Sequence, residues 1–329
     1  MKIVYCGKVA KRRLNMNTPL MNKQSQLIDE LKSISTEGQN QDTLDIDLLD
    51  AKGVLTKINN EDQKVAGVIE AIIPDIAQAV DKIVDAFSNG GRLIYIGAGT
   101  SGRLGILDAV ECPPTFSVSE QQVIGIIAGG EQAIYKAVEG AEDSEILAIE
   151  DLKVVNLSSK DIIVGIAASG RTPYVISAMN YAKSVGANVV GVSCSYNEKF
   201  EQANDINICA VVGAEALTGS TRMKSGTAQK LILNMLSTAS MIRSGKSYRN
   251  LMIDVNASNE KLYARAVRIV MQATDCDYKI AKQALDNANN NAKLATLMVL
   301  TGMSVEQARV SLSKNNGFLR QSVQQAEQK

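Results

Sequence analysis

Two short loops combine glycine with hydroxyl side chains directly after apolar runs. They are IGAGTSGRLG at residues 96–105 and ASGRTP at residues 168–173. Where such a loop leads into a helix, free backbone N–H groups, hydroxyl donors and the positive end of the helix dipole together favour a bound anion. The candidate binding residues in the two loops are Gly99, Thr100, Ser101, Ser169, Gly170, Arg171 and Thr172. Together the loops indicate a shared site for a phosphorylated small molecule.

The first loop also satisfies the G-x-G-x-x-G pattern of dinucleotide sites through Gly97, Gly99 and Gly102. Such a site requires an acidic residue about 20 positions further on, near the end of the next strand. That position is occupied by IAGG at residues 127–130, so we reject a dinucleotide. Each loop alone could equally be a tight turn in which Ser or Thr caps a helix, and Arg171 could be a surface charge.

A third segment with glycine and hydroxyl residues, GAEALTGSTRMKSGTAQK, spans residues 213–230 and leads into a long helical pattern. Its Ser220 and Thr221 are predicted to form a further wall of the same anionic pocket, with Glu215 binding sugar hydroxyls. The alternative is a capped amphipathic helix without a ligand. On the first interpretation the candidate site draws on three separate parts of the chain.

The absence of histidine restricts the chemistry available to this chain of 329 residues. Without an imidazole there is no Ser-His-Asp or Cys-His nucleophile and no histidine-ligated metal. An enzyme of this composition that works near neutral pH must transfer protons with carboxylates, Lys, Tyr or Cys whose pKa values are shifted. The carboxylates to consider are Glu111 and those of the acidic run at residues 139–143, which includes Glu142.

The neighbouring residues predict how each glutamate is held. Glu111 directly precedes the sequence CPP at residues 112–114, and the double proline predicts an extended backbone immediately after it. Glu142 lies in EGAED at residues 139–143, which is predicted to close a helix. Partial burial beside the negative end of a helix would raise the pKa of a carboxylate, as an acid/base pair requires. A solvated helix end is the alternative interpretation of EGAED.

Charge and cysteine content exclude other classes of protein. The chain has 35 basic and 35 acidic residues, so its formal charge of zero offers no general attraction for nucleic acid or an anionic membrane. Its 5 cysteines form no C-x-x-C pair and are interpreted as reduced thiols, not as a disulfide framework or a zinc site. No apolar run approaches the roughly 20 residues of a membrane helix, and no signal peptide is recognised. We expect a cytoplasmic protein with no nucleic-acid or membrane partner.

The elements that must position these loops follow from the apolar pattern. Residues 61–87 have helical spacing, which Pro74 divides into two helices. Short apolar runs then alternate with helical stretches, at residues 92–96, 123–128, 161–168, 188–193 and 206–212. Near-continuous apolar strands between helices predict an α/β fold with a parallel sheet covered on both faces. From residue 218 to the end nearly all of the chain is predicted to be helical, with a break near Gly302.

Four long, ungapped stretches make the sequence recognisable: GAGTSGRLGILDAVECPPTF at 97–116, AVEGAEDS at 137–144, GIAASGRTPYV at 165–175 and VGAEALTGSTRMKSGTAQKLILNMLSTASMIRSGK at 212–246. They closely resemble the N-acetylmuramic acid 6-phosphate etherase family, which belongs to the sugar isomerase (SIS) fold group and is related to the glucokinase regulatory protein. The resemblance extends from about Thr36 to Gln321. One departure is Ser117, which stands where related sequences commonly carry glycine.

The resemblance implies a flavodoxin-like α/β fold, in which a SIS-type parallel sheet is sandwiched by helices and followed by a small C-terminal three-helix bundle. We therefore expect four regions along the chain. They are a polar N-terminal tail (1–35), an N-terminal helical segment (36–82), the SIS sugar-phosphate domain (83–246) and a C-terminal helical region containing a bundle similar to a ubiquitin-associated domain (247–329).

The resemblance also implies a reaction. It is cleavage of the D-lactyl ether of N-acetylmuramic acid 6-phosphate to N-acetylglucosamine 6-phosphate and D-lactate, by elimination and then water addition, in amino-sugar catabolism and cell-wall recycling. By motif match, Glu111 resembles the general acid and Glu142 the base at C2, in a homodimer without a metal or organic cofactor. The alternative is a non-catalytic sugar-phosphate-binding regulator of the SIS fold, which would not require both glutamates. An aldose–ketose phosphate isomerase would share the loops but not the two glutamate motifs.

Overall fold

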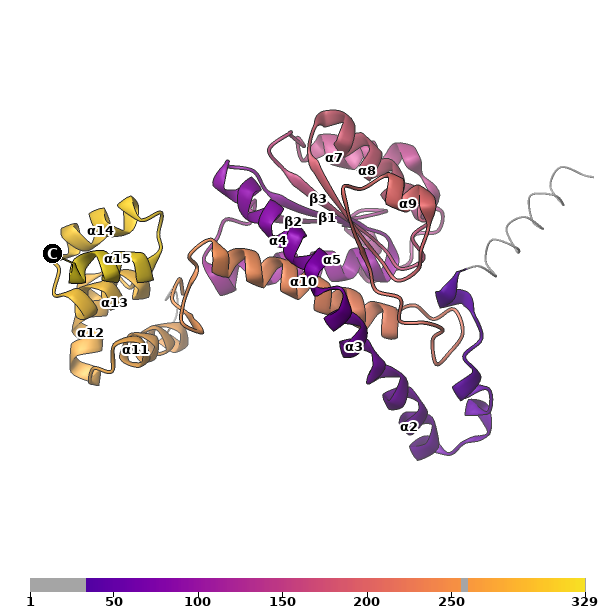
Figure 1. The fold of residues 1–329 in the computed structure, drawn as a ribbon, viewed down its shortest axis with the longest axis horizontal. Helices are drawn as coiled ribbons and strands as arrows, with labels where there is room; N and C mark the ends of the chain where they lie inside the picture. The colour runs from indigo at the N-terminus through magenta and orange to yellow at the C-terminus, as the bar shows by residue number, and fades with distance from the viewer. Residues whose placement is uncertain (1–33, 256–259, 329) are drawn as a thin grey trace, which may run out of the picture.

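The computed structural model describes residues 34–255 and 260–328, and its centre is a parallel β-sheet (Figure 1). The strands are β1 (Leu93–Gly97), β2 (Val123–Ile127), β3 (Ile162–Ala167), β4 (Asn188–Ser193) and β5 (Ile206–Cys209). Their order, β2-β1-β3-β4-β5, is that of flavodoxin-like folds. Every residue of β1 and β3 is buried, which explains why both strands are unbroken apolar runs in the sequence. The predicted α/β class and the predicted strands are confirmed.

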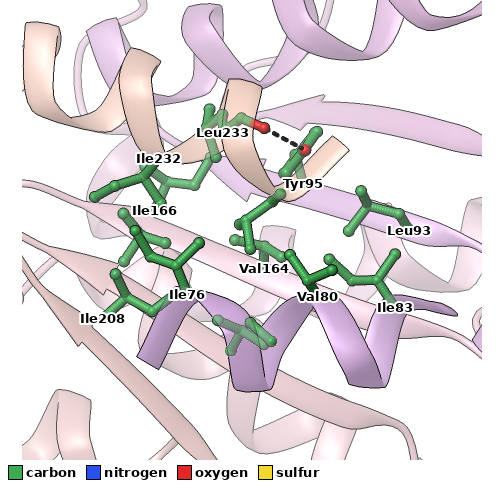
Figure 2. Packing of buried hydrophobic residues seen from close by; sticks show 14 of the residues in the cluster. Ile76, Val80, Ile83, Leu93, Tyr95, Val164, Ile166, Ile208, Ile232 and Leu233 are labelled. Carbon is green, nitrogen blue, oxygen red and sulfur yellow. Dashed lines mark hydrogen bonds between the residues drawn. The ribbon is translucent and has the colours of Figure 1, made fainter. Parts of the chain in front are cut away.

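Helices cover both faces of this sheet. The helices of this part of the chain are α2 (Ala51–Asp62), α3 (Lys64–Ala71), α4 (Ile73–Ser88), α5 (Gly99–Phe116), α6 (Gln132–Tyr135), α7 (Glu145–Val154), α8 (Pro173–Val185), α9 (Glu198–Gln202) and α10 (Lys224–Arg243), of which α2 contacts α3 and α10 rather than the sheet. Short 3-10 turns occur at η1 (Ser35–Glu37), η2 (Gln41–Thr43), η3 (Ile46–Leu48) and η4 (Ala141–Asp143). On one face Leu93 and Tyr95 of β1 join a core with α4, α5 and α10 (Figure 2). On the other, Ile94 and Ile96 join a core with α7 and α8, because side chains alternate along a strand.

The break predicted at Pro74 is confirmed. α3 ends at Ala71 and α4 begins at Ile73, with Pro74 in the first turn of α4. Proline is tolerated there because the first amide groups of a helix have no partner within it. The two helices share the core that lies under β1 and β3, so the N-terminal helical segment packs on the sheet.

The C-terminal region has a core of its own. A short hairpin of β6 (Ser247–Tyr248) and β7 (Leu251–Met252) precedes α11 (Glu260–Thr274), α12 (Tyr278–Asn287), α13 (Ala292–Thr301), α14 (Val305–Lys314) and α15 (Leu319–Glu327). All of these helices contribute to the same core, so a three-helix bundle can only be a part of it. Gly302, with φ of 70°, ends α13 at the predicted break. The hairpin is the non-helical part of a region that was predicted to be nearly all helical, and α10 begins at Lys224, after Ser220 and Thr221.

Several exclusions made from composition can be compared with the structure. None of the helices in the described ranges is both long and apolar enough to cross a membrane. Within the same ranges no cluster of three or more Cys, Asp or Glu side chains could hold a metal. The described cysteines, Cys112, Cys194, Cys209 and Cys276, are free thiols, as predicted, whereas Cys6 and the predicted tail up to residue 33 lie outside the described residues.

Candidate functional site

The two glycine- and hydroxyl-containing loops lie side by side at one edge of the sheet. The first follows β1 and the second follows β3, and these two strands are hydrogen-bonded neighbours, with Gly97 paired to Ile166. Between β1 and β3 the strand order changes direction, since β2 lies on the outer side of β1 and β4 on the outer side of β3. Ligands of open α/β sheets bind at such a switch point, outside the carboxyl ends of the strands. The predicted adjacency of the two loops is therefore confirmed.

The glycines of the first loop allow α5 to approach the sheet closely. A Cβ atom on Gly102 would lie 2.7 Å from the carbonyl oxygen of Gly97 and 2.6 Å from Cγ1 of Ile127. Gly99, the first residue of α5, has φ of 54°, a conformation that favours glycine. The G-x-G-x-x-G pattern is thus explained by packing and backbone geometry, without a dinucleotide.

Neither loop has a Ser or Thr side chain that caps its helix. The N-cap of α5 is Ala98 and the N-cap of α8 is Thr172, and in the described structure no side chain makes a capping hydrogen bond at either helix. The simple interpretation of the hydroxyls as N-caps is therefore wrong. α5 has 18 residues and α8 has 13, so both are full helices. At the start of each, the first amide groups are not used by a side-chain cap. Both starts can accept an anion.

The second loop is shaped by Ser169 and Gly170. The Ser169 hydroxyl accepts a hydrogen bond from the backbone N–H of Arg171 at 3.3 Å, and Gly170 has φ of 66°. Both Ser169 and Thr172 are half-buried. The side chain of Arg171 borders a hollow of about 780 Å³ on the outer side of α8, together with Asn180 and residues of α9.

The third segment reaches the first loop at the start of α10. A Cβ atom on Gly226 would lie 3.7 Å from Cγ2 of Thr100 and 3.6 Å from the carbonyl oxygen of Thr221. The Ser101 hydroxyl, 8% exposed, donates a hydrogen bond of 3.0 Å to Oε1 of Gln229 on α10. The start of α10 therefore lies beside Thr100 and Ser101, and Ser220 and Thr221 are in the segment that directly precedes this helix. Gln229 carried no sequence signal of its own beyond its position in the GTAQK motif.

Glu215 is the clearest correction in this segment. Its side chain has no exposed surface. Oε2 accepts the backbone N–H of Lys224 at 2.9 Å, and Oε1 accepts both the N–H of Ser225 at 3.0 Å and its hydroxyl at 2.8 Å. Both carboxylate oxygens are therefore occupied at the start of α10, so Glu215 holds that helix start and does not face a sugar.

Lys224 is likewise used internally. It is 2% exposed, and its Nζ lies 2.6 Å from Oε2 of Glu61 at the end of α2. Burial alone would raise the pKa of Glu61, but hydrogen bonds from Lys224, Lys64 and Asn40 lower it to about 2. The pair ties α2 to α10 and leaves the charge of Lys224 matched within the fold.

The N-terminal segment crosses the carboxyl edge beside the second loop. The hydroxyls of Ser35 and Ser195 are 2.8 Å apart, and the backbone N–H of Thr36 lies 3.4 Å from the Ser195 hydroxyl. A Cβ atom on Gly170 would lie 3.1 Å from the carbonyl oxygen of Ser195. The segment after β4 therefore joins η1 to the loop after β3, which closes one side of the site.

The position of Glu111 differs from the prediction. α5 continues through Pro113 and Pro114 to Phe116, so the backbone after Glu111 is helical, not extended. Proline has a φ value suited to a helix, but Pro113 and Pro114 each lack the N–H that would donate to the carbonyl four residues earlier, so this part of α5 lacks two intrahelical hydrogen bonds. Glu111 is exposed, and it lies ten residues beyond Ser101 on the same helix, about 15 Å along its axis. Ser117 ends α5 with φ of 49°, a left-handed conformation that favours glycine at this position of a helix end.

Glu142 also differs from the prediction. EGAED does not close a helix, because α6 ends at Tyr135 and Glu142 lies in the 3-10 turn η4, immediately before α7. The predicted place beside a helix C-terminus is therefore wrong. Glu142 is exposed, and η4 packs against α8. Since α7 leads back to the start of β3, its first residues lie toward the carboxyl edge of the sheet, where the two loops are.

Asp108 is a buried acid that none of the sequence motifs indicates. It lies one turn before Glu111 on α5 and accepts hydrogen bonds from the Tyr95 hydroxyl at 2.8 Å and the Ser237 hydroxyl at 3.1 Å. Burial raises the pKa of its carboxyl to about 6, although these hydrogen bonds lower it. This group joins α5 to β1 and α10, and so holds the helix that carries both Ser101 and Glu111.

Comparisons with known proteins agree on the kind of domain. Sequence models match the glucokinase regulatory protein N-terminal SIS domain at residues 75–183, a SIS domain at 135–239 and the C-terminal lid domain of glucokinase regulatory protein at 249–292. The N-acetylmuramic acid 6-phosphate etherase of Colwellia psychrerythraea is 73% identical over 93% of this chain and 99% of its own length. That of Pseudoalteromonas atlantica is 62% identical over 92% and 99%. N-acetylmuramic acid 6-phosphate etherase 2 of Vibrio cholerae is 59% identical over 92% and 98%.

Proposed function

Because the chain belongs to the N-acetylmuramic acid 6-phosphate etherase family, we propose that it cleaves the lactyl ether of its substrate with Glu111 and Glu142. The enzyme acts on N-acetylmuramic acid 6-phosphate, in amino-sugar metabolism and cell-wall recycling. The observation that carries the proposed site is the pair of uncapped helix starts, α5 and α8, side by side at the switch point of the sheet. The sugar phosphate would be bound there, in the cytoplasm.

The 6-phosphate is held by local donors. The first amide groups of α5 and α8, with the hydroxyls of Thr100, Ser101, Ser169 and Thr172, surround the carboxyl ends of β1 and β3. The net charge of zero means that attraction for the phosphate comes from these groups and the helix dipoles. Since the phosphate is remote from the reacting carbons, its binding energy serves to fix the sugar in register.

The elimination needs only one base and one acid. In the ring-opened sugar the C1 aldehyde acidifies the proton on C2, which Glu142 removes, while Glu111 protonates the ether oxygen on C3. The C3–O bond breaks, D-lactate leaves, and a C2–C3 double bond conjugated to the aldehyde remains. Water then adds at C3 and a proton returns to C2, which gives N-acetylglucosamine 6-phosphate. Two carboxyl groups in complementary protonation states can perform every proton transfer.

The positions of the two glutamates support a homodimer. Ser101 and Glu111 of one chain are about 15 Å apart along α5. This separation is much larger than the distance between the 6-phosphate and the ether oxygen on C3 within one sugar. Glu142, by contrast, lies toward the edge that carries the loops. We infer that Glu111 acts on the substrate bound to a second copy of the chain, so that each site is completed across an interface.

We expect Ser101→Ala and Ser169→Ala each to raise KM about tenfold or more and to change kcat little. Each removes a hydrogen bond to a charged group, and the phosphate takes no part in the bond changes. Initial rates of D-lactate release over a range of substrate concentrations measure both constants. Ser177→Ala on α8 is the matched control, because its hydroxyl donates to the carbonyl of Glu145. An unchanged KM in both loop variants would contradict the two-loop site.

The activity itself is tested by incubating the purified protein with N-acetylmuramic acid 6-phosphate and assaying D-lactate. Stoichiometric D-lactate and N-acetylglucosamine 6-phosphate are expected. Saturable binding of the substrate without any lactate would instead support the alternative, a non-catalytic sugar-phosphate-binding regulator. The presence of both Glu111 and Glu142 favours the enzyme, because a regulator has no use for an acid/base pair.

The shared site is tested by mixing two proteins that each release little lactate at low substrate concentration. Glu111→Gln chains are combined with chains carrying both Ser101→Ala and Ser169→Ala, and subunits are allowed to exchange. If each site takes Glu111 from the partner, random pairing leaves about a quarter of the sites intact, and lactate release at low substrate concentration returns to that level. Light scattering should give twice the 35.3 kDa of one chain. No recovery in dimers that do exchange would place both parts of the site in one chain.

A further inference from the structure

Gln229 is a buried side chain whose amide is only half used. It lies on α10 and is 1% exposed. Its Oε1 accepts the hydrogen bond from the Ser101 hydroxyl at 3.0 Å, whereas its Nε2 has no hydrogen-bond partner among the described residues. Buried amide donors are rarely left unpaired in folded proteins, because a donor that loses its hydrogen bond to water without gaining another lowers the stability of the fold. An unpaired donor directly beside the first loop therefore needs a functional explanation.

The same hydrogen bond creates a conflict for Ser101. A serine hydroxyl has one hydrogen to donate and two lone pairs to accept with. While that hydrogen points to Oε1 of Gln229, the hydroxyl offers only lone pairs to a ligand, and the oxygens of a phosphate dianion are acceptors as well. Ser101 can therefore hold a phosphate only if Gln229 stops accepting its hydrogen.

We propose that Gln229 is a positioning residue that directs the Ser101 hydroxyl hydrogen toward the phosphate. Rotating the amide by half a turn exchanges Oε1 and Nε2, so that Nε2 donates to the Ser101 oxygen at the same distance. The Ser101 hydrogen is then free to donate to a phosphate oxygen. The last torsion of glutamine is broad and roughly two-fold, so this exchange needs no movement of the helix.

The chemistry explains why the residue is a glutamine. A glutamate at position 229 could only accept, so it would retain the Ser101 hydrogen and would also place a negative charge beside a phosphate dianion. An apolar side chain would leave the hydroxyl without direction. The position fits this role, since α10 meets the first loop where Gly226 lies next to Thr100. The inference rests on the proposed function, because it takes Ser101 to bind the 6-phosphate.

The test measures the affinity for N-acetylglucosamine 6-phosphate by titration calorimetry, so that it does not depend on catalysis. We expect Gln229→Met to weaken binding about 3–10-fold, the effect of one net hydrogen bond, and Gln229→Glu to weaken it further. Ser240→Ala is the control: Ser240 lies on the same helix, is fully buried, and its hydroxyl also has no partner in the described structure. Its binding constant should be unchanged.

A double-mutant cycle separates positioning from a general effect on the fold. If Gln229 acts through Ser101, Gln229→Met should have no further effect on affinity in a Ser101→Ala background. Equal effects in both backgrounds would overturn the inference, as would unchanged affinity of Gln229→Met and Gln229→Glu while Ser169→Ala still weakens binding. If the wild-type protein binds no sugar phosphate at all, it is the proposed function that fails.

A measurement on the native sequence covers variants that do not fold. In protein labelled with nitrogen-15 at glutamine, the side-chain amide signals of Gln229 are expected to shift when inorganic phosphate or N-acetylglucosamine 6-phosphate is added, because Nε2 changes from unpaired to donating. Unlabelled N-acetylglucosamine, which lacks the phosphate, should cause no such shift. Signals that stay in place while the phosphorylated ligand saturates would overturn the inference.

Discussion

Glu111→Gln is expected to lower kcat for lactate release by about 10²–10⁴-fold, the contribution of a positioned general acid. Glutamine keeps the size of the side chain but has no acidic proton to give to the ether oxygen. Lactate would then have to leave with an unprotonated alkoxide oxygen, which is a poor leaving group. Binding should be preserved, because the phosphate loops are unchanged and the acid acts at the ether oxygen on C3, remote from the 6-phosphate. Single-turnover lactate assays and calorimetry with the same preparation measure the two effects separately.

The control for this variant is Glu120→Gln. Glu120 is an exposed carboxylate shortly after the end of α5, so its replacement removes the same charge from the same surface without touching the proposed acid. We expect its kcat to equal that of the wild type. Full activity of Glu111→Gln would remove this residue from the mechanism, and equal losses in both variants would indicate a general charge effect.

Glu142→Gln is expected to cause a loss of similar size, also about 10²–10⁴-fold in kcat, because without a base the C2 proton is not removed. Glu139→Gln is the control from the same segment, since Glu139 is exposed and lies three residues away. The two predictions differ in one measurable respect. In deuterated water, Glu111→Gln should still exchange the C2 proton of the substrate without releasing lactate, as followed by NMR, whereas Glu142→Gln should do neither.

This exchange assigns the two roles independently of their resemblance to the family. Exchange that is retained by Glu142→Gln and lost by Glu111→Gln would reverse the acid and the base. If both variants exchange the C2 proton at the wild-type rate but release no lactate, both glutamates act only in breaking the C–O bond. Another group must then be the base. Each outcome therefore assigns a different group as the base that removes the C2 proton.

The local pattern of the chain was sufficient to predict the fold class and the two phosphate loops. Strands buried on both faces have to be apolar throughout, so β1 and β3 appear as unbroken apolar runs between helices. The break before α4 could be predicted because proline acts on its own turn. Glycine and hydroxyl residues after a strand likewise form a local signal, and the loops after β1 and β3 are where it predicted them.

Predictions of backbone and side-chain environment near the glutamates were less successful. The double proline after Glu111 does not extend the backbone, because packing against the sheet holds α5 to its last turn despite the lost hydrogen bonds. The sequence EGAED predicts a helix end, but α6 is a single turn and Glu142 lies in the 3-10 turn η4 that precedes α7. In both places tertiary contacts outweighed the local preference of the residues.

The sequence alone therefore determined the features that depend on neighbours along the chain. These are the α/β class, the strands, and loops suited to a phosphate. Only the tertiary structure decided what depends on residues distant in sequence. Ser101 and Gln229 are 128 residues apart, Glu215 is buried because α10 begins over it, and the length of α5 separates Glu111 from the loops of its own chain. These contacts and distances form only when segments far apart in the sequence pack together, so the local spacing of residue types does not predict them.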